Sequence, residues 1–377
     1  MSGKPLTKAK SDLVRVVGID DNHHENIEIT NINRNFLPGL TEKSNEYAAR
    51  KYNTILTKHC FYSKNEAVIS DKIKQIRYYS NHFVVAETYD FVNIGQLNEQ
   101  AIERLQLTND VRYLIFKYKN ENLVDFGDFL FNIADPTRFV FSAITSFSYI
   151  LMSLRTLNMN DVCFFNLSPQ NIAFNLDCGE NAVIRNFQTS LQMSQLNVEY
   201  ITNIIKAQND YTHKPLEVHV LFYLIQNNLS TISYSFIEEI CEEFVKKLPF
   251  LKLFSEKFGA SYKEACVASL KKYINRTQTD IISDILENSD KWDVYSLSVL
   301  YLHIFGGISQ VFSLQQNFIT NFTSELCKNV HPNPANRSSL NELFANYNRL
   351  LSDENNWSFV NKMSRNKMPQ LFSILGE

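Results

Sequence analysis

The sequence contains little glycine and proline. Its 377 residues include 10 Gly and 9 Pro, against 28 Phe and 18 Tyr. The pattern G-x-G-x-x-G does not occur anywhere, so the chain lacks the common glycine-rich loop that cradles phosphate groups. Because 44% of the residues are hydrophobic and 20% are charged, the composition is typical of a folded globular protein and excludes an intrinsically disordered one.

A strong charge of either sign is also absent. The formal net charge is −3, and the Lys and Arg residues are dispersed, with short clusters only at 246–247 and 271–272. General nucleic-acid binders usually carry a basic stripe along one face. We therefore expect no nucleic-acid partner.

The cysteines follow no metal-binding pattern. No C-x-x-C pair occurs among the six, and no His stands at zinc-ligand spacing from them. Scattered cysteines of this kind are typical of reduced, mostly buried thiols in the cytosol. The sequence thus predicts no metal site and a cytoplasmic location. The cysteines are Cys60, Cys163, Cys178, Cys241, Cys266 and Cys327.

No hydrophobic run has the length of a membrane span. The two apolar runs that stand out are 139–154 and 294–305, and both are shorter than the roughly 20 residues needed to cross a bilayer. Buried core helices explain them better, so we expect no membrane-spanning segment.

The first third of the chain alternates β-branched and aromatic residues with polar ones. This pattern predicts a small β-rich lobe over residues 1–118. A segment with apolar residues at helical spacing, 41–59, predicts one helix that begins at a capping Thr41. The predicted strands are 12–19 and 26–32, paired as a hairpin, and 82–92 and 111–119.

The remainder of the chain is mainly helical in pattern. Residues 171–188 are the exception, because they alternate, turn near Gly179 and alternate again, which is typical of a β-hairpin. Residues 119–377 should form a larger helical lobe, which makes the whole chain an α+β fold. The predicted helices are 122–133, 139–157, 234–247, 261–273, 277–288, 293–305, 309–328 and 338–351.

Five segments match short motifs in the order in which a eukaryotic protein kinase carries them. "FFNLSPQNI" resembles the catalytic loop H-R-D-L-K-P-x-N-I, and "RNFQ" resembles the motif x-D-F-G. "HKPLEVHV" resembles the end of the activation segment, "KWDVYSL" the central helix of the larger lobe, and "NPANRSSLNEL" the final arginine motif. The chain therefore resembles the protein kinase-like superfamily, which implies a bilobal protein-kinase-like fold.

The resemblance also identifies chemical groups that have been replaced. Asn166 stands at the position of the catalytic base, Ser168 at that of the loop lysine and Asn186 at that of the metal-binding aspartate. Asn171, the second metal ligand of the family, is kept. Phosphoryl transfer needs the base, the lysine and carboxylate-held magnesium. A neutral amide cannot act as a general base, whose contribution is roughly 10²–10⁴-fold in rate, and it binds a hard dication less well than a carboxylate does.

These losses imply a pseudokinase, which is not an enzyme and needs no cofactor. Phe187 and Gln188 complete the x-D-F-G analogue, with Phe187 expected in the core. The small-lobe lysine of the family cannot be placed, and Glu46 is the candidate for the helix acid that would pair with it. The losses argue against nucleotide binding with metal, while nucleotide binding without metal stays open.

Three charged residues at motif positions have structural roles in the family. The resemblance implies a buried ion pair between Glu217 and Arg337, and it implies that Asp293 accepts hydrogen bonds from the backbone of the catalytic loop. A simple helix N-cap is an alternative role for Asp293. Removing one partner of a buried ion pair costs roughly 3–5 kcal/mol.

The segment between Glu217 and Asp293 is much longer than the family usually has. Its helical stripes, over about 226–290, predict an inserted module that either packs on its own domain or docks a partner. The insertion and the Asn- and Phe-rich composition resemble kinase-like proteins of nucleocytoplasmic large DNA viruses. This resemblance implies a structural or protein-interaction role with other proteins as partners, including viral capsid or virion proteins, and a location in the cytoplasm or in a virus particle.

Two alternatives remain open from the sequence. One is an active, atypical serine/threonine kinase that uses a displaced acid such as Asp161 or Asp177. The other is an unrelated α+β binding protein, which would require the hairpin 171–188 to lie far from the helix 293–305.

Overall fold

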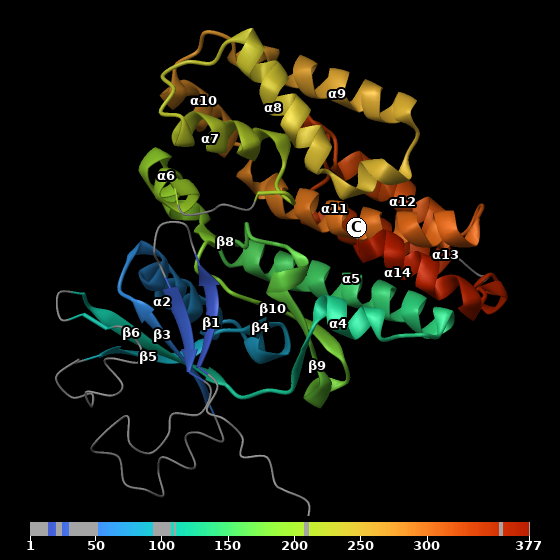
Figure 1. Ribbon diagram of the computed structural model, residues 1–377, viewed down its shortest axis with the longest axis horizontal. Helices are drawn as coiled ribbons and strands as arrows, with labels where there is room; N and C mark the ends of the chain where they lie inside the picture. The colour runs from blue at the N-terminus through green and yellow to red at the C-terminus, as the bar shows by residue number, and fades with distance from the viewer. Residues whose placement is uncertain are drawn as a thin grey trace, which may run out of the picture.

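Small β-sheets and a larger group of helices make up the described part of the chain, so the predicted α+β class is confirmed (Figure 1). The computed structural model describes residues 14–19, 25–29, 52–92, 107–108, 111–206, 211–353 and 357–376, with the backbone alone for the first two segments.

The larger sheet has five strands, and every neighbouring pair is antiparallel. Its first two strands pair as the predicted hairpin, and the predicted strands 82–92 and 111–119 are also confirmed, the former as two strands. In spatial order the strands are β1 (Val14–Ile19), β2 (Glu25–Ile29), β3 (Tyr52–Lys58), β6 (Tyr113–Lys119) and β5 (Ala86–Val92).

The predicted helix 41–59 is wrong over its second half. Residues 52–58 form strand β3, while 41–51, with Thr41 and Glu46, lie outside the described residues. In β3 the buried positions alternate, with Thr54 and Leu56 inward, and all seven residues pair with β6. Short apolar stretches fit either period, and the neighbouring strand decided between them.

Helix α2 (Phe61–Lys74) follows directly and was not predicted. It begins after Cys60, whose backbone N–H donates to Ser63 Oγ at 2.9 Å. Ala67 packs with the sheet residues Ala86, Leu114 and Phe116, whereas Ile69 and Ile73 of the same helix belong to the main core. The helix therefore joins two hydrophobic clusters.

A second sheet has four strands in the order β4-β10-β9-β7. The predicted hairpin at 171–188 is confirmed as β9 (Ile172–Asn175) and β10 (Asn181–Arg185), with Gly179 in the left-handed region at φ 74°. Strand β4 (Phe83–Val84) pairs with β10 in parallel. This sheet stands between the larger sheet and the helices (Figure 1).

The predicted helix 122–133 is too long. Residues Leu123–Asp125 form strand β7, which pairs with β9, and only Phe126–Phe131 are helical, as α4. Backbone pairing of 123–125 with β9 outweighed the amphipathic pattern that the whole segment shows.

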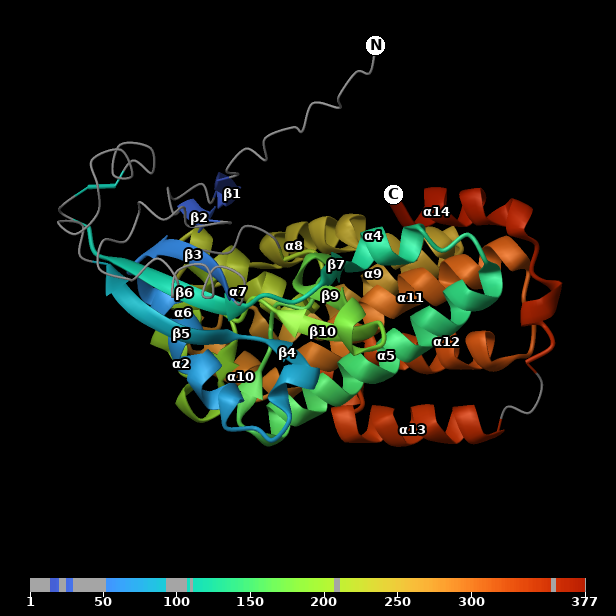
Figure 2. The same ribbon diagram turned by 90° about the horizontal axis from the view of Figure 1, so that it is seen from below.

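The core of the helical part surrounds α5 (Pro136–Met159) and α11 (Trp292–Phe312). Figure 2 shows α5, α12 and α13 running alongside α11. The predicted helix 309–328 is in fact interrupted, because α11 ends at Ser313 (φ 52°) and α12 begins after a new cap at Asn317. The remaining helices are α6 (Val198–Lys206), α7 (Leu216–Gln226), α8 (Tyr234–Lys247), α9 (Glu256–Leu270), α10 (Gln278–Leu286), α12 (Phe318–Asn329), α13 (Leu340–Asp353) and α14 (Met368–Gly376).

Two helical segments exceed the length expected from their apolar runs. Pro136–Met159 and Ser289–Phe312 each have 24 residues, so by length and composition alone both helices could cross a membrane. The expectation that these segments are too short to span a bilayer is therefore corrected. Their polar ends continue the helix beyond the apolar runs. Within the protein, 56% and 83% of their most apolar windows are buried, as expected of core helices.

The segment 226–290 contains α8, α9 and α10, and α8 has the bounds that the sequence predicts. The apolar stripe of α8 (Ile237, Ile240, Cys241 and Phe244) is buried against its neighbours α7 and α9. Of the two alternatives, the stripe therefore packs on its own domain.

Candidate functional site

Hydrogen bonds to Asp293 fix the backbone of the loop that resembles a catalytic loop. This buried carboxylate accepts the backbone N–H groups of Phe164 and Phe165, each at 2.8 Å. The predicted role of Asp293 as backbone acceptor is thus confirmed, and α11 has no side-chain N-cap bond. Phe165 sits in the left-handed region at φ 62°, which a non-glycine residue adopts only when its surroundings hold it there.

Lys214 completes this arrangement and was missed in the sequence. Its ammonium is buried, donates to the Phe165 carbonyl at 2.5 Å and lies 4.0 Å from the centre of the Phe165 ring. Burial raises the pKa of the Asp293 carboxyl, while the two backbone N–H groups and the charge of Lys214 oppose that rise. The only sequence signal was a lysine three residues before Glu217.

The residues predicted at the degenerate site lie together in a chain of amide contacts. Asn171 Nδ2 donates to the Asn166 carbonyl at 2.8 Å and to Ser168 Oγ at 3.2 Å. Asn186 Nδ2 in turn donates to Asn171 Oδ1 at 3.1 Å. The opposite orientation of the Asn186 amide would bring two oxygens together, so the contact itself defines which way the amide points.

The amide contacts limit which oxygen atoms of the site are available as metal ligands. Asn171 Oδ1, the one metal ligand that the family resemblance leaves, already accepts a hydrogen bond from Asn186. Within the described ranges no group of three or more His, Cys, Asp or Glu could hold a metal. The residues present therefore do not fit a pair of carboxylate-held magnesium ions.

The two displaced acids that the sequence left open are engaged elsewhere. Asp161 accepts hydrogen bonds from Lys72 Nζ and Ser194 Oγ, both at 2.6 Å. Asp177 accepts the backbone N–H of Asn122 at 3.1 Å. Neither carboxylate contacts the amide groups of the site.

Phe187 and Gln188 connect the site to helix α2. The Phe187 ring is fully buried and makes edge contacts with Phe83 and Phe164, at centroid distances of 5.9 and 5.3 Å, which confirms its place in the core. The Gln188 carbonyl accepts Asn65 Nδ2 at 3.0 Å. The chain thus passes from the amide contacts directly into the joint with α2.

A second residue missed in the sequence, the acid Glu66, lies in α2 beside this joint. Its Oε1 accepts the hydroxyl of Tyr118 at 3.2 Å. Burial raises the pKa of the Glu66 carboxyl to about 7, although the Tyr118 hydroxyl and the Phe187 backbone N–H offset part of that rise. Among the described residues Glu66 is a helix acid near the site, while the predicted Glu46 lies outside them.

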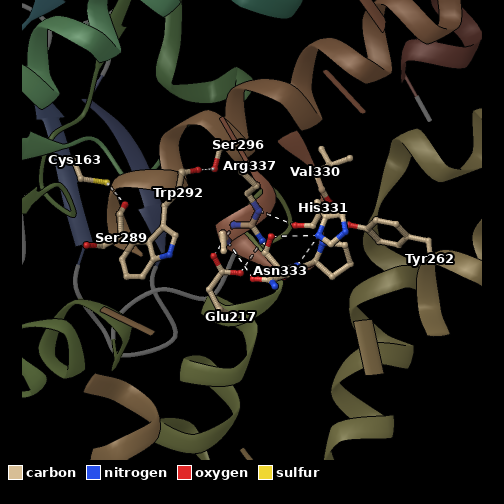
Figure 3. Close-up of polar contacts among 12 residues, drawn as sticks. Cys163, Glu217, Tyr262, Ser289, Trp292, Ser296, Val330, His331, Asn333 and Arg337 are labelled. Atoms are coloured by element: carbon tan, nitrogen blue, oxygen red, sulfur yellow. Dashed lines mark hydrogen bonds and ion pairs between the residues drawn. The ribbon is translucent and has the colours of Figure 1, made fainter. Parts of the chain in front are cut away.

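The predicted ion pair between Glu217 and Arg337 is confirmed (Figure 3). Arg337 Nη1 and Nη2 donate to the two Glu217 carboxylate oxygens at 2.6 and 2.9 Å, and the guanidinium side chain is 0% exposed. Arg337 also donates to the carbonyls of His331 and Pro332. Burial alone would lower the pKa of Arg337, but the charge of Glu217 outweighs it and raises the pKa.

The ring of Phe126 contacts both the β9–β10 hairpin and the central helix α11. Phe126 stacks on Phe174 of β9 at 5.8 Å and makes an edge contact with Tyr301 of α11 at 6.3 Å. The hairpin and the helix therefore lie close together, and the condition required for an unrelated α+β binding protein is not met.

No protein-family model matches the chain, and no curated protein matches it.

Proposed function

We propose that the chain is a pseudokinase, a degenerate protein-kinase-like protein of two lobes that acts as a structural or protein-interaction module. The observation that carries the proposal is the hydrogen bond from Asn186 Nδ2 to Asn171 Oδ1. It places an amide donor against an oxygen where phosphoryl transfer requires a carboxylate and a metal ion.

Three contacts support the kinase-like arrangement. Asp293 holds the backbone of the loop 164–165, Glu217 pairs with Arg337, and the β9–β10 hairpin precedes Asn186. The resemblance predicted the first two contacts, which join motifs 129 and 120 residues apart in the sequence. A five-stranded antiparallel sheet with helix α2 packed against it suits the smaller lobe.

The side chains at positions 166 and 168 support the proposed loss of phosphoryl transfer. Asn166 offers an amide where a base must accept the proton of the substrate hydroxyl, and Ser168 offers no positive charge to the transition state. Asp161 and Asp177 are hydrogen-bonded elsewhere, which weakens these two acids as candidates for the alternative of an active atypical serine/threonine kinase.

Other proteins are the proposed partners, in the cytoplasm or in a virus particle as a capsid or virion component. The segment 226–290 supports this role, because α8 exposes Glu238 and Glu239 to solvent while its apolar stripe is buried. A stable helical surface of this kind can contact a partner without any change in the site.

Restoring two carboxylates tests the proposal. The variant Asn166→Asp with Asn186→Asp should gain stabilisation by ATP with Mg²⁺, because the carboxylate introduced at position 186 would replace the amide donor with a metal ligand. At about tenfold excess of nucleotide over its Kd, the melting temperature should rise by about 2 °C. The measurement is a thermal-shift titration with and without Mg²⁺.

The matched control adds Asn171→Ala to the same two substitutions. The added change should abolish the gain, because the second ligand of the metal is removed. The unmodified protein should show no Mg²⁺-dependent shift. A shift in the unmodified protein equal to that of the restored variant would contradict the proposal.

A further inference from the structure

Glu66 is a buried carboxyl group with no cation beside it. It is 5% exposed; its Oε1 has the hydroxyl of Tyr118 as partner, and its Oε2 has no hydrogen-bond partner. Over the described part of the chain no Lys, Arg or His forms an ion pair with it. Ala67, next to Glu66 in the chain, and Tyr118, the partner of Glu66, pack with Leu114 and Phe116 in an apolar cluster, while the neutral donors Ser70 and the Phe187 backbone N–H lower the pKa of the carboxyl in part.

Helix α2, which carries Glu66, connects the five-stranded sheet to the loop of the site. On the sheet side it packs against β5, and on the loop side Asn65 Nδ2 donates to the carbonyls of Gln188 and Ser190, at 3.0 and 2.8 Å. Near the other end, Lys72 pairs with Asp161. A change in the seating of α2 would therefore alter the contact between the sheet and the rest of the protein.

We propose that Glu66 makes α2 a proton-sensitive joint, in which the neutral carboxylic acid keeps the helix seated and ionisation loosens it. This inference does not depend on the proposed function, because it uses only the burial and contacts of α2. A carboxylate formed at this place would be buried without a counter-charge, which strongly favours opening of the helix toward water.

The acids and phenols around α2 keep their charge above about pH 6. Burial would raise the pKa of Asp71 and of Asp161, but hydrogen bonds and the lysines beside them outweigh it and hold both below the usual range. Burial and the charges of Lys64 and Arg112 lower the pKa of His59, just before the helix, so this ring loses its proton at a lower pH than a free imidazole does. Burial raises the pKa of Tyr118 and a hydrogen bond to Asp71 raises that of Tyr89, so both phenols stay protonated.

The direction of the pH effect follows from the raised pKa of Glu66. The seated helix binds the proton more tightly than the open helix does, so seating is favoured at low pH and weakened as the pH rises through about 7. Between about pH 6 and about pH 8.5 the equilibrium constant for opening of α2 should rise about tenfold.

Hydrogen exchange of the full chain measures this constant. Protection factors of the backbone amides of 61–74, corrected for the intrinsic pH dependence of exchange, should fall about tenfold over that range. Those of α5 should stay constant. The isosteric variant Glu66→Gln should make the protection of α2 independent of pH, whereas Glu238→Gln, at an exposed helical position, should behave as the unmodified protein.

A second variant keeps the test valid if Glu66→Gln does not fold. Tyr118→Phe removes the donor that favours the ionised carboxyl and so raises the pKa of Glu66 in the seated helix, and the fall in protection should continue to a higher pH before it levels off. The inference is overturned if the protection of α2 does not change with pH, if Glu66→Gln retains the change, or if Tyr118→Phe moves it to lower pH.

Discussion

Replacing Glu217 by Gln should destabilise the protein by about 3–5 kcal/mol, because it leaves a buried guanidinium without its counter-charge. The side chain of Arg337 is 0% exposed and that of Glu217 is 4% exposed, so solvent cannot compensate the loss. Glutamine has nearly the same shape, which limits the change to charge and hydrogen bonding. Urea denaturation followed by circular dichroism should show a lower midpoint with an unchanged slope.

An exposed pair provides the matched control for this result. Arg138 and Glu180 form an ion pair at 2.8 Å with both side chains largely exposed, so Glu180→Gln should cost less than about 1 kcal/mol. Replacing both buried partners, with Glu217→Leu and Arg337→Met, should recover part of the loss, because no buried charge then remains. Equal losses of unfolding free energy for Glu217→Gln and Glu180→Gln would show that the buried pair contributes no more to stability than an exposed pair does.

Asp293→Asn should cost about 3 kcal/mol, through the backbone of the loop rather than through a charge pair. The carboxylate of Asp293 accepts two N–H groups, from Phe164 and Phe165, with one oxygen for each. The Asn amide can accept only one of them, and its NH₂ group would face the other N–H donor. Denaturation should report the loss of stability, and hydrogen exchange should locate it at residues 164–167.

A double-mutant cycle with Lys214 distinguishes an interaction of Asp293 with this lysine from a general loss of core packing. Because the charge of Lys214 stabilises the ionised form of Asp293, the buried ammonium loses a favourable interaction once Asp293 is neutral, so Lys214→Met should then cost less than it does alone. The double variant should therefore be more stable than the sum of the two single losses predicts. Strictly additive losses would show that the two groups do not interact.

Motifs with a fixed chemical role could be predicted from the sequence. Glu217 and Arg337 are 120 residues apart, yet each belongs to a local motif, and the motifs together indicated the pair. The same holds for Asp293 and the loop at 164–165. The residue types at 166, 168, 171 and 186 were also visible, so the absence of carboxylates there was expected.

Contacts that no local pattern encodes could not be predicted. Glu66 meets Tyr118 through the packing of α2 on the sheet, and Lys214 meets Phe165 across 49 residues of sequence. The hydrogen bond between Asn186 and Asn171 depends on the left-handed backbone of Asn186 at φ 67°. Each requires the tertiary structure, since the sequence gives only the types of residue.

Segments of mixed periodicity explain the errors in secondary structure. In 52–58 and 123–125 the side chains fit a helix or a strand, and pairing with β6 or β9 decided for the strand. At 313–317 a left-handed serine and a new N-cap separate two helices that share one apolar pattern. Local propensity therefore identified the α+β class but not every boundary.

Electron paramagnetic resonance of Mn²⁺ with ATP tests the loss of metal-dependent phosphoryl chemistry most directly, because Mn²⁺ replaces Mg²⁺ and reports its own ligands. Since Asn171 Oδ1 already accepts Asn186 Nδ2, we predict the same Mn²⁺·ATP spectrum with and without stoichiometric protein. A protein-bound Mn²⁺ signal at one or two ions per chain, abolished by Asn171→Ala, would contradict this account.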